Sequence, residues 1–285
     1  DRVRQQIKVA FMKRLILAIG LAIACSVAAA AAPIAIERQF APKSALVDAR
    51  FEASDEASAV VVDHAAWGRF LDAYVVEGPT GVNLVRYKAV TPADKTALAA
   101  YIAALEATDT AALSRKEQIA FWFNLYNAAT VKLILDHPGV SSIQDIKKPW
   151  DTPVAAVMGR ALTLNEIEHG IIRPVAQDAR IHYAVNCASM GCPNLARAPY
   201  TGAGLDAALN AAARAYVNHP RGVNVVKGKV RLSKIYGWYR DDFGKDDAAM
   251  FDHIRQYADP ALAESLKGVK KAAGYDYDWA LNGAD

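Results

Sequence analysis

The apolar positions between residues 60 and 140 recur at intervals of three and four, which is helical spacing. A helix is expected over 92–106, because Thr91 offers a capping hydroxyl and Pro92 occupies the first turn. Another is expected over 64–75, with the apolar stripe Trp67, Phe70, Leu71 and Tyr74.

A longer helix is expected to begin at the capping box Ser114-Arg-Lys-Glu117 and to end at His137-Pro138-Gly139. It is apolar nearly all round, which is typical of a helix that is buried on most sides. Asn124 and Asn127 lie within it, and an unpaired buried amide costs on the order of 1–3 kcal/mol. Bonding to backbone is the favoured interpretation. The alternative is that one of them orients a catalytic imidazole, as an Asn does in Cys-His-Asn hydrolases.

Beyond this helix the period shortens, and strands alternate with short helices. Helices followed by interleaved strands predict the α+β class, with a helical N-terminal half packed on a small, mostly antiparallel sheet in a single domain. The expected elements are a hairpin over 154–162, a helix over 163–172 opened by the capping box Thr163–Glu166, a strand over 181–186, a helix over 205–217, and a hairpin of 223–226 with 229–232.

Residues 1–32 are predicted to be a signal peptide with an upstream extension. Met12-Lys13-Arg14 is a positive start, and an apolar run followed by alanines comes after it. The run is too short and too rich in Ala for a membrane span, so a periplasmic or secreted location is expected. Residues 33–60 are expected to be a linker, and residues 61–283 the domain.

Cys25 raises the question of a lipid anchor, but Ala22-Ile23-Ala24 before it is a poor lipobox. Membrane contact is therefore expected only through the leader, with a lipid on Cys25 disfavoured. The net charge of +3 comes from residues 1–32, because outside them 28 of the 33 basic and 29 of the 30 acidic side chains remain. A near-neutral chain lacks the basic surface that nucleic acid requires, so the expected partner is a small molecule or a peptide.

Five motifs rich in aromatic and polar residues follow one another: Phe121–Ala128, Ile167–Gly170, Arg180–Cys187 with Cys192-Pro193, Leu232–Tyr239 with Asp242-Phe243, and Tyr277–Asn282. Together they resemble the domain of unknown function 547 family, over about residues 61–283. That family includes exported bacterial proteins and plant proteins with coiled-coil extensions. The resemblance implies a fold and candidate residues but no established reaction. A Gly often follows the first cysteine in this family, whereas here Ala188 narrows the geometry that the loop can adopt.

Cys187 and Cys192 are the only cysteines after the leader and the first candidates for chemistry. One interpretation is a disulfide, because an exported chain with two cysteines meets an oxidising compartment. A second is that Cys187 is a nucleophile presented at the end of a strand, and a third is a pair of buried thiols. The spacing is not C-x-x-C, so a thioredoxin-like role is disfavoured.

His182 precedes Cys187 on the expected strand. Residues five apart on a regular strand face opposite sides, so a direct pair of the two would require a bulge or an earlier end to the strand. The alternative is a core imidazole with its hydrogen bonds satisfied.

Glu168 falls inside the apolar stripe of the 163–172 helix, and His169 lies at the edge of that stripe. A carboxylate directed into a core must be paired, protonated or functional. The structural interpretation is a salt bridge to Arg173 or Arg180, and the functional one is acid–base catalysis or metal ligation. Neither H-E-x-x-H nor a paired C-x-x-C occurs, so no metal and no cofactor are expected.

Two hypotheses follow. The first is a hydrolase-like domain, thiol-dependent if the sulfurs are reduced, that acts on peptide or amide bonds. The second is a non-catalytic binding or scaffold module with a Cys187–Cys192 disulfide. Both require the candidate side chains to converge on one pocket at the mouth of the sheet. Under the first hypothesis the catalytic residues are Cys187 as nucleophile, His182 or His169 as base and Asn127 or Glu168 as orienting residue, and the binding residues are Cys192, Asn124, Arg180, Ser233 and Trp238.

Overall fold

The computed structural model describes residues 34–284. The chain divides into a unit that ends at Gln39 and a unit that begins at Phe40. The described residues of the first unit, 34–39, belong to helix α2 (Ile34–Phe40). The predicted signal peptide and Cys25 lie outside the described residues. Within 34–284, no helix is both long and apolar enough to cross a membrane.

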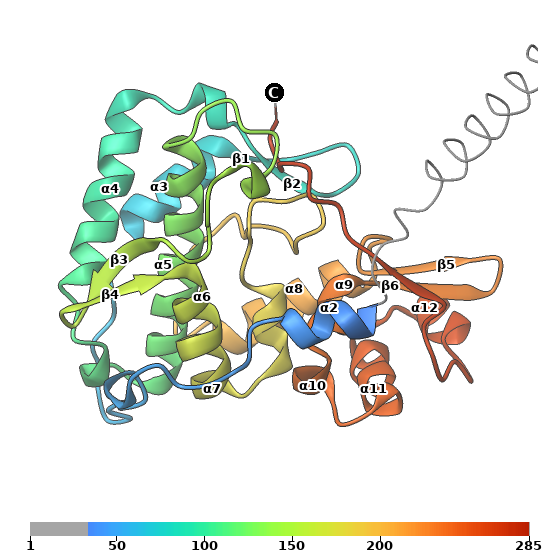
Figure 1. The fold of residues 1–285 in the computed structure, drawn as a ribbon. Helices are drawn as coiled ribbons and strands as arrows, with labels where there is room; N and C mark the ends of the chain where they lie inside the picture. Colours follow the sequence, from blue (N-terminus) through green and yellow to red (C-terminus); the bar gives the residue numbers. More distant parts are fainter. Residues whose placement is uncertain (1–33, 285) are drawn as a thin grey trace, which may run out of the picture. The chain divides into compact units, whose positions relative to one another are not determined.

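Helices α3 (Ala65–Tyr74), α4 (Pro92–Glu106) and α5 (Arg115–Leu135) confirm the three helices expected in the first part of the chain (Figure 1). The Thr91 hydroxyl accepts a hydrogen bond from the backbone N–H of Asp94 at 3.1 Å, which is the predicted cap of α4. Helix α5 is buried along most of its length and forms the centre of the larger core. Short 3₁₀ turns connect the elements of this half: η1 (Ala49–Phe51), η2 (Tyr87–Ala89), η3 (Thr110–Ala112) and η4 (Ile143–Asp145).

The capping box predicted at the start of α5 is wrong. The side chain of Ser114 caps nothing, and the Glu117 carboxylate accepts the backbone N–H groups of Val62 at 2.9 Å and Gly202 at 2.7 Å. Glu117 is buried, so two backbone donors from loops that pack on the helix satisfy it better than a single donor at the helix end. Its role is to fasten two distant segments to α5.

The strands confirm the α+β class, but they lie in three small sheets rather than one. Strand β6 pairs antiparallel with β5 and parallel with β7. Strand β7, near the C-terminus, therefore lies beside the β5–β6 hairpin. The sheets are β1 (Val75–Glu77) with β2 (Asn83–Val85), β3 (Pro153–Val157) with β4 (Arg160–Thr163), and β5 (Val223–Val226) with β6 (Lys229–Ser233) and β7 (Gly274–Asp276).

A second core lies under the C-terminal helices and is rich in aromatic rings, among them Tyr183, Tyr216 and Tyr236. Helix α8 confirms the helix expected over 205–217. The helices of this half are α8 (Leu205–Val217), α9 (Lys234–Trp238), α10 (Arg240–Phe243), α11 (Asp247–Tyr257) and α12 (Pro260–Ser265).

The strand predicted over 181–186 is wrong. This segment begins as the 3₁₀ turn η6 (Ala179–Tyr183), capped by Asp178, and continues as an irregular stretch. All side chains of residues 181–186 are buried. The alternating pattern of a half-buried strand, with one buried and one exposed face, is therefore absent from this segment. Its backbone is satisfied by α5 instead of a neighbouring strand: Asn127 donates to the Ala184 carbonyl at 2.9 Å and accepts the Asn186 N–H at 2.9 Å.

The helix predicted over 163–172 changes geometry partway. Helix α6 (Leu164–Ile167) begins with the expected capping box, but Glu168–Ile172 is a turn of π-helix (η5), followed by α7 (Arg173–Ala176). Pro174 explains the change, because it has no N–H to give to Gly170 and its ring would crowd that carbonyl. The Gly170 carbonyl instead accepts the N–H of Val47 at 2.9 Å. The widened turn carries Glu168 and His169.

The C-terminal tail, residues 277–284, runs against the cysteine loop and reaches β2 near the C-terminus (Figure 1). Ser189 forms an antiparallel bridge with Leu281, and the N–H of Gly191 donates to the Asp278 carbonyl at 2.8 Å. The backbone of Val85 pairs with Gly283 farther along the tail. The tail therefore closes the fold over the cysteine loop.

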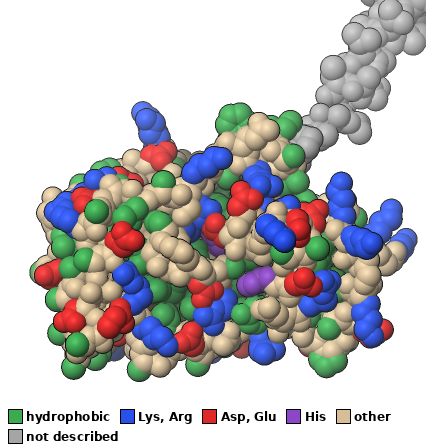
Figure 2. Space-filling view, turned by 90° about the horizontal axis from the view of Figure 1, so that it is seen from below, with side chains coloured by type: hydrophobic (Ala, Val, Ile, Leu, Met, Phe, Trp, Pro, Cys, Tyr) green, Lys and Arg blue, Asp and Glu red, His purple; other side chains and the backbone are tan. Residues whose placement is uncertain are grey.

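Acidic and basic side chains are interspersed on the face shown in Figure 2, over the part of the chain that is described. Histidine side chains are visible on the same face, next to charged ones. Charge of one sign does not dominate this face.

Candidate functional site

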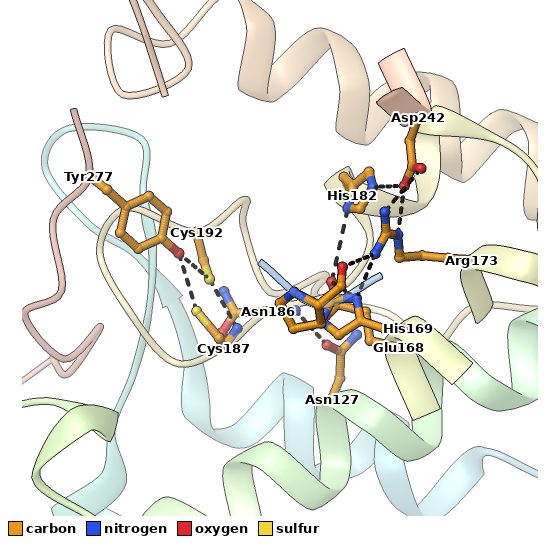
Figure 3. A network of polar contacts seen from close by, with 11 residues as sticks. Asn127, Glu168, His169, Arg173, His182, Asn186, Cys187, Cys192, Asp242 and Tyr277 are labelled. Atoms are coloured by element: carbon orange, nitrogen blue, oxygen red, sulfur yellow. Dashed lines mark hydrogen bonds and ion pairs between the residues drawn. The ribbon is translucent and has the colours of Figure 1, made fainter. Parts of the chain in front are cut away.

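Two thiols and two hydroxyls form the first of two polar clusters, the thiol cluster of Cys187, Ser189, Cys192 and Tyr277. Figure 3 shows Cys187, Cys192 and Tyr277 of this cluster. The Tyr277 hydroxyl lies 3.2 Å from the Sγ of Cys187, 3.1 Å from the Sγ of Cys192 and 2.9 Å from the Ser189 hydroxyl. The backbone N–H of Cys187 donates to the Sγ of Cys192 at 3.0 Å, and the Ser189 hydroxyl donates to the same sulfur at 3.5 Å. Both cysteines are free thiols.

The loop that carries the sulfurs is held from inside by Asn186. Its amide oxygen accepts the N–H of Ala188 at 2.8 Å, and its amide nitrogen donates to the Pro193 carbonyl at 2.7 Å. Ala188 has φ of +62°, in the left-handed region that favours glycine, so its backbone is strained. Gly191 lies against the tail, and a Cβ there would be 2.8 Å from the backbone nitrogen of Asp278.

The hydrogen bonds around Cys192 favour its charged form. Burial raises the pKa of Cys192, but the hydrogen bonds from Cys187, Ser189 and Tyr277 outweigh burial and lower that pKa to about 6. The pKa of Cys187 is raised well above its usual value, first because its thiol hydrogen-bonds to Cys192 and then because of burial. The pair therefore loses one proton easily and the second with difficulty, which is the behaviour of two coupled acids.

The second group, the acid–imidazole cluster, consists of Glu168, His169, Arg173, His182 and Asp242 (Figure 3). Asp242 on α10 accepts from the Nε2 of His182 at 2.7 Å and from the Nε of Arg173 at 2.7 Å. The Glu168 carboxylate lies 3.8 Å from the Nδ1 of His169 and 3.9 Å from the Nδ1 of His182. These side chains come from η5, α7, η6 and α10.

Burial governs the protonation of this cluster. Burial raises the pKa of Glu168, although His182, Tyr126 and Arg173 oppose the change. Burial, together with the Arg173 charge, lowers the pKa of His169 to about 3. Burial also lowers the pKa of His182, against the opposing effect of Asp242. For Asp242 burial acts upward, but the bonds from His182 and Arg173 hold its pKa well below the usual range.

An aromatic row joins the two clusters. The Tyr239 ring stacks on His182 with centroids 4.5 Å apart, and Trp238 lies next to it at 6.4 Å. Trp238 in turn contacts Tyr277, with centroids 4.9 Å apart. Tyr277, Trp238 and Tyr239 are partly exposed, so the row forms part of the molecular surface beside the thiol cluster.

The sulfurs and the imidazoles do not touch. Among residues 34–284, no hydrogen bond or ion pair links Cys187 or Cys192 to a histidine. The backbone of 182–187 and the aromatic row connect the two clusters. Tyr126 also lies between them, because its pKa is raised by burial, by Glu168, to which it hydrogen-bonds, and by the charges of both sulfurs. The candidate residues thus gather in one region of the fold, but in two separate groups.

The other predicted residues have structural partners. The Asn124 side chain donates to the Tyr200 carbonyl at 2.8 Å and accepts the Tyr200 N–H at 3.0 Å. This is the bonding to backbone that was expected for Asn124. Arg180 pairs with Asp178 and Asp206 and makes no ion pair with Glu168. Ser233 caps α9, as expected, and also accepts the Tyr216 hydroxyl at 2.8 Å. Trp238 belongs to the aromatic row.

Four site residues were not singled out from the sequence: Ser189, Tyr239, Asp242 and Tyr277. Three of them lie inside the motifs that carry the family resemblance, and Ser189 lies between the two cysteines. Only the motif resemblance pointed to Tyr277 and Asp242, because nothing in their local pattern distinguishes them from ordinary surface residues.

Within the described residues, no three His, Cys, Asp or Glu side chains are grouped so that they could hold a metal ion. In the acid–imidazole cluster the Nδ1 of His169 lies 3.2 Å from Nη1 of Arg173, and that guanidinium would repel a cation.

This arrangement defines an α+β domain with a paired-thiol site next to a buried acid–imidazole cluster. Residues 110–217 match the family model described as "Protein of unknown function, DUF547", which supports the resemblance over this segment. The match includes both cysteines, Glu168, His169 and His182. Asp242 and Tyr277 lie beyond it. Neither the curated proteins nor the solved structures contain a significant match to the chain.

Proposed function

We propose that this chain is an exported, thiol-dependent hydrolase-like domain that acts on peptide or amide bonds. The observation that carries the proposal is the convergence of three polar groups on the Sγ of Cys192: the N–H of Cys187 donates to it, and the hydroxyls of Ser189 and Tyr277 lie 3.5 Å and 3.1 Å away, where each can donate to a thiolate. Structural thiols in a core have no need of donors, whereas a reactive thiolate requires stabilisation of its charge.

The two sulfurs differ in how exposed they are, and this difference assigns their roles. Cys187 is partly exposed and is therefore the sulfur that a peptide can reach, while the exposed fraction of Cys192 is 3%. Cys187 is the nucleophile, and the Cys192 thiolate accepts its proton as the sulfur attacks the carbonyl carbon. A carbon–sulfur bond forms, the carbon–nitrogen bond breaks, and the leaving amine takes the proton back from Cys192. Water then cleaves the thioester and restores the thiol pair.

In this scheme the base is a thiolate and not an imidazole. His182 hydrogen-bonds to Asp242 and His169 to Arg173, and burial lowers the pKa of both imidazoles, which favours their neutral form. The acid–imidazole cluster fixes α10 and the aromatic row next to the thiols. Asn127 positions the chain that leads to Cys187, through the Ala184 carbonyl and the Asn186 N–H.

The second candidate function is a non-catalytic binding or scaffold module closed by a Cys187–Cys192 disulfide. The observation in its favour is that the sulfurs of both cysteines lie against the Tyr277 hydroxyl, at 3.2 Å and 3.1 Å. In an oxidising compartment such a pair can close.

The test is the pH dependence of alkylation by iodoacetamide, in a Cys25→Ser background that leaves only the two thiols. Because the Cys192 thiolate is the base for Cys187 in this scheme, the rate of Cys187 alkylation should follow the ionisation of Cys192, with a midpoint at about pH 6. In Cys192→Ser the midpoint should move toward about 8.5, the pKa of an ordinary cysteine. The reduced protein should also acquire an acetyl group on Cys187 from p-nitrophenyl acetate, and Cys187→Ser should not. An alkylation midpoint that is the same in both proteins, or the absence of an acetyl adduct, would overturn the proposal.

A further inference from the structure

The two sulfurs differ in what can reach them. The charge of the pair is held on Cys192, whose exposed fraction is only 3%, while the partly exposed Cys187 carries the proton. A polymeric substrate is excluded from a sulfur with so little surface. A molecule of the size of hydrogen peroxide needs far less room, so the buried sulfur can still meet a small oxidant.

The surroundings of Cys192 suit attack on a peroxide. The backbone N–H of Cys187 donates to its Sγ, and the hydroxyls of Ser189 and Tyr277 lie 3.5 Å and 3.1 Å from it, where each can donate to a thiolate. Donors hold the sulfur as a thiolate, and the thiolate is the form that hydroperoxides oxidise. A donor that is free to turn toward the departing oxygen also stabilises the charge that develops there.

Cys187 is placed to react with the oxidised product. Its sulfur and that of Cys192 both lie within 3.2 Å of the Tyr277 hydroxyl, and only four residues lie between the two cysteines. The loop is held in this shape by Asn186 from within and by the C-terminal tail from outside. The fold therefore holds the two sulfurs close together in one short loop.

We propose that Cys192 is a site of oxidation by small hydroperoxides and that Cys187 resolves the product to a disulfide. The Cys192 thiolate attacks the distal oxygen of the peroxide, the O–O bond breaks, and a sulfenic acid and an alkoxide form. The Cys187 sulfur then attacks the sulfur of the sulfenic acid. The S–S bond forms, the S–O bond breaks, and the hydroxide leaves as water with the proton of Cys187. Two electrons pass from the dithiol to the peroxide.

This chemistry connects the two hypotheses for the domain. The disulfide removes the nucleophile Cys187, so oxidation stops the proposed hydrolysis, and an external dithiol restores it by exchange. The expected loss of hydrolysis on oxidation rests on the proposed function. The oxidation itself requires only the thiol cluster.

The experiment follows free thiols and intact mass of the Cys25→Ser protein after treatment with one equivalent of hydrogen peroxide. Both thiols should disappear together with the loss of two hydrogen masses, and dithiothreitol should restore them. Cys187→Ser should instead stop with oxygen added at Cys192. Cys192→Ser should keep Cys187 reduced at the same dose.

Ser189→Ala is the second variant, because it keeps both sulfurs and removes one donor to Cys192. It should slow disulfide formation several-fold. Cumene hydroperoxide, which is too bulky for a buried sulfur, should react more slowly than hydrogen peroxide. The inference is overturned if both thiols survive peroxide in the Cys25→Ser protein, or if Cys192→Ser oxidises as fast. A thiol count requires no substrate, so this failure is distinct from the absence of an acetyl adduct before oxidation.

Discussion

The hydroxyl of Tyr277 lies 3.1 Å from the Sγ of Cys192, although 85 residues separate the two in the chain. The same hydroxyl is within 3.2 Å of the Sγ of Cys187. Tyr277 directly follows β7, which pairs with β6, and the tail beyond it pairs with the cysteine loop. The last residues of the chain therefore contribute to the thiol cluster and do not merely cover it.

Replacement of Tyr277 by Phe tests this contribution. The ring and its contact with Trp238 remain, but the sulfurs lose a donor, and a hydrogen bond to a charged group contributes about 1.5–3 kcal/mol. The pKa of the thiol pair should rise by at least about one unit, since one unit corresponds to 1.36 kcal/mol. The iodoacetamide profile measures this change. Tyr257→Phe is the control, because that hydroxyl contacts neither sulfur, and equal profiles for the two variants would contradict the assignment.

The contact between Gly191 and the tail gives a second prediction. A Cβ at Gly191 would lie 2.8 Å from the nitrogen and 2.9 Å from the oxygen of Asp278, so Gly191→Ala must push the tail away. We expect a loss of about 1–3 kcal/mol in the free energy of unfolding, as for other overpacked sites. Because Tyr277 precedes Asp278, the thiol pKa should rise as well.

Gly68→Ala is the matched control for this change. A Cβ at Gly68 in α3 would meet only the Pro199 ring, at the ordinary contact distance of 3.5 Å. Alanine is favoured over glycine inside a helix, so this variant should gain up to about 1 kcal/mol. Urea denaturation of the two variants gives the comparison. A destabilisation of the same size in both would show that the tail contact has no special role.

The helices could be predicted because their signals are local. Thr91 and Thr163 act as caps with the residues that follow them, and the apolar stripe of α3 needs no knowledge of the rest of the chain. The same reasoning failed where a distant segment provided a better partner. Glu117 bonds Val62 and Gly202, and so is not available to cap α5.

The site was harder to predict than the fold for the same physical reason. The 181–186 segment has the composition of a strand, but its backbone is bonded to the side chain of Asn127. The partners that define the two clusters, Tyr277 and Asp242, are brought in by tertiary pairing far along the chain. Which residues join the site depends on tertiary packing, and a local sequence pattern does not encode that packing.

The third prediction concerns Glu168, whose pKa is raised by burial and which has no arginine in direct ion pair within the described residues. Glutamine resembles the protonated acid and can still accept from Tyr126. Glu168→Gln should therefore cost less than about 1 kcal/mol, whereas Glu168→Ala should cost about 2–4 kcal/mol, because it opens a cavity and leaves a buried hydroxyl without its acceptor. Chemical denaturation at pH 7 measures both. Equal losses would identify the charge of Glu168 as a structural ion.

The fourth prediction is a pH dependence of stability carried by His169. Burial, with Arg173 beside it, lowers the pKa of His169 in the folded protein to about 3, while the unfolded chain binds a proton there below about pH 6.5. Between these values the unfolded state holds more protons, so the free energy of unfolding must fall as the pH falls. A single such group contributes a slope of up to about 1.4 kcal/mol per pH unit. Because the pKa values of His182 and His253 are also lowered, the wild-type slope should exceed that of one group.

His169→Gln isolates the contribution of this residue, because glutamine can still accept the hydrogen bond from Arg173 but does not titrate. Its slope between pH 6 and pH 5 should be shallower than that of the wild type by up to about 1.4 kcal/mol per pH unit, the value for one proton. Urea denaturation at closely spaced pH values gives the two curves. Parallel curves would mean that His169 already carries its proton in the folded state, and would remove the neutral imidazole from the acid–imidazole cluster.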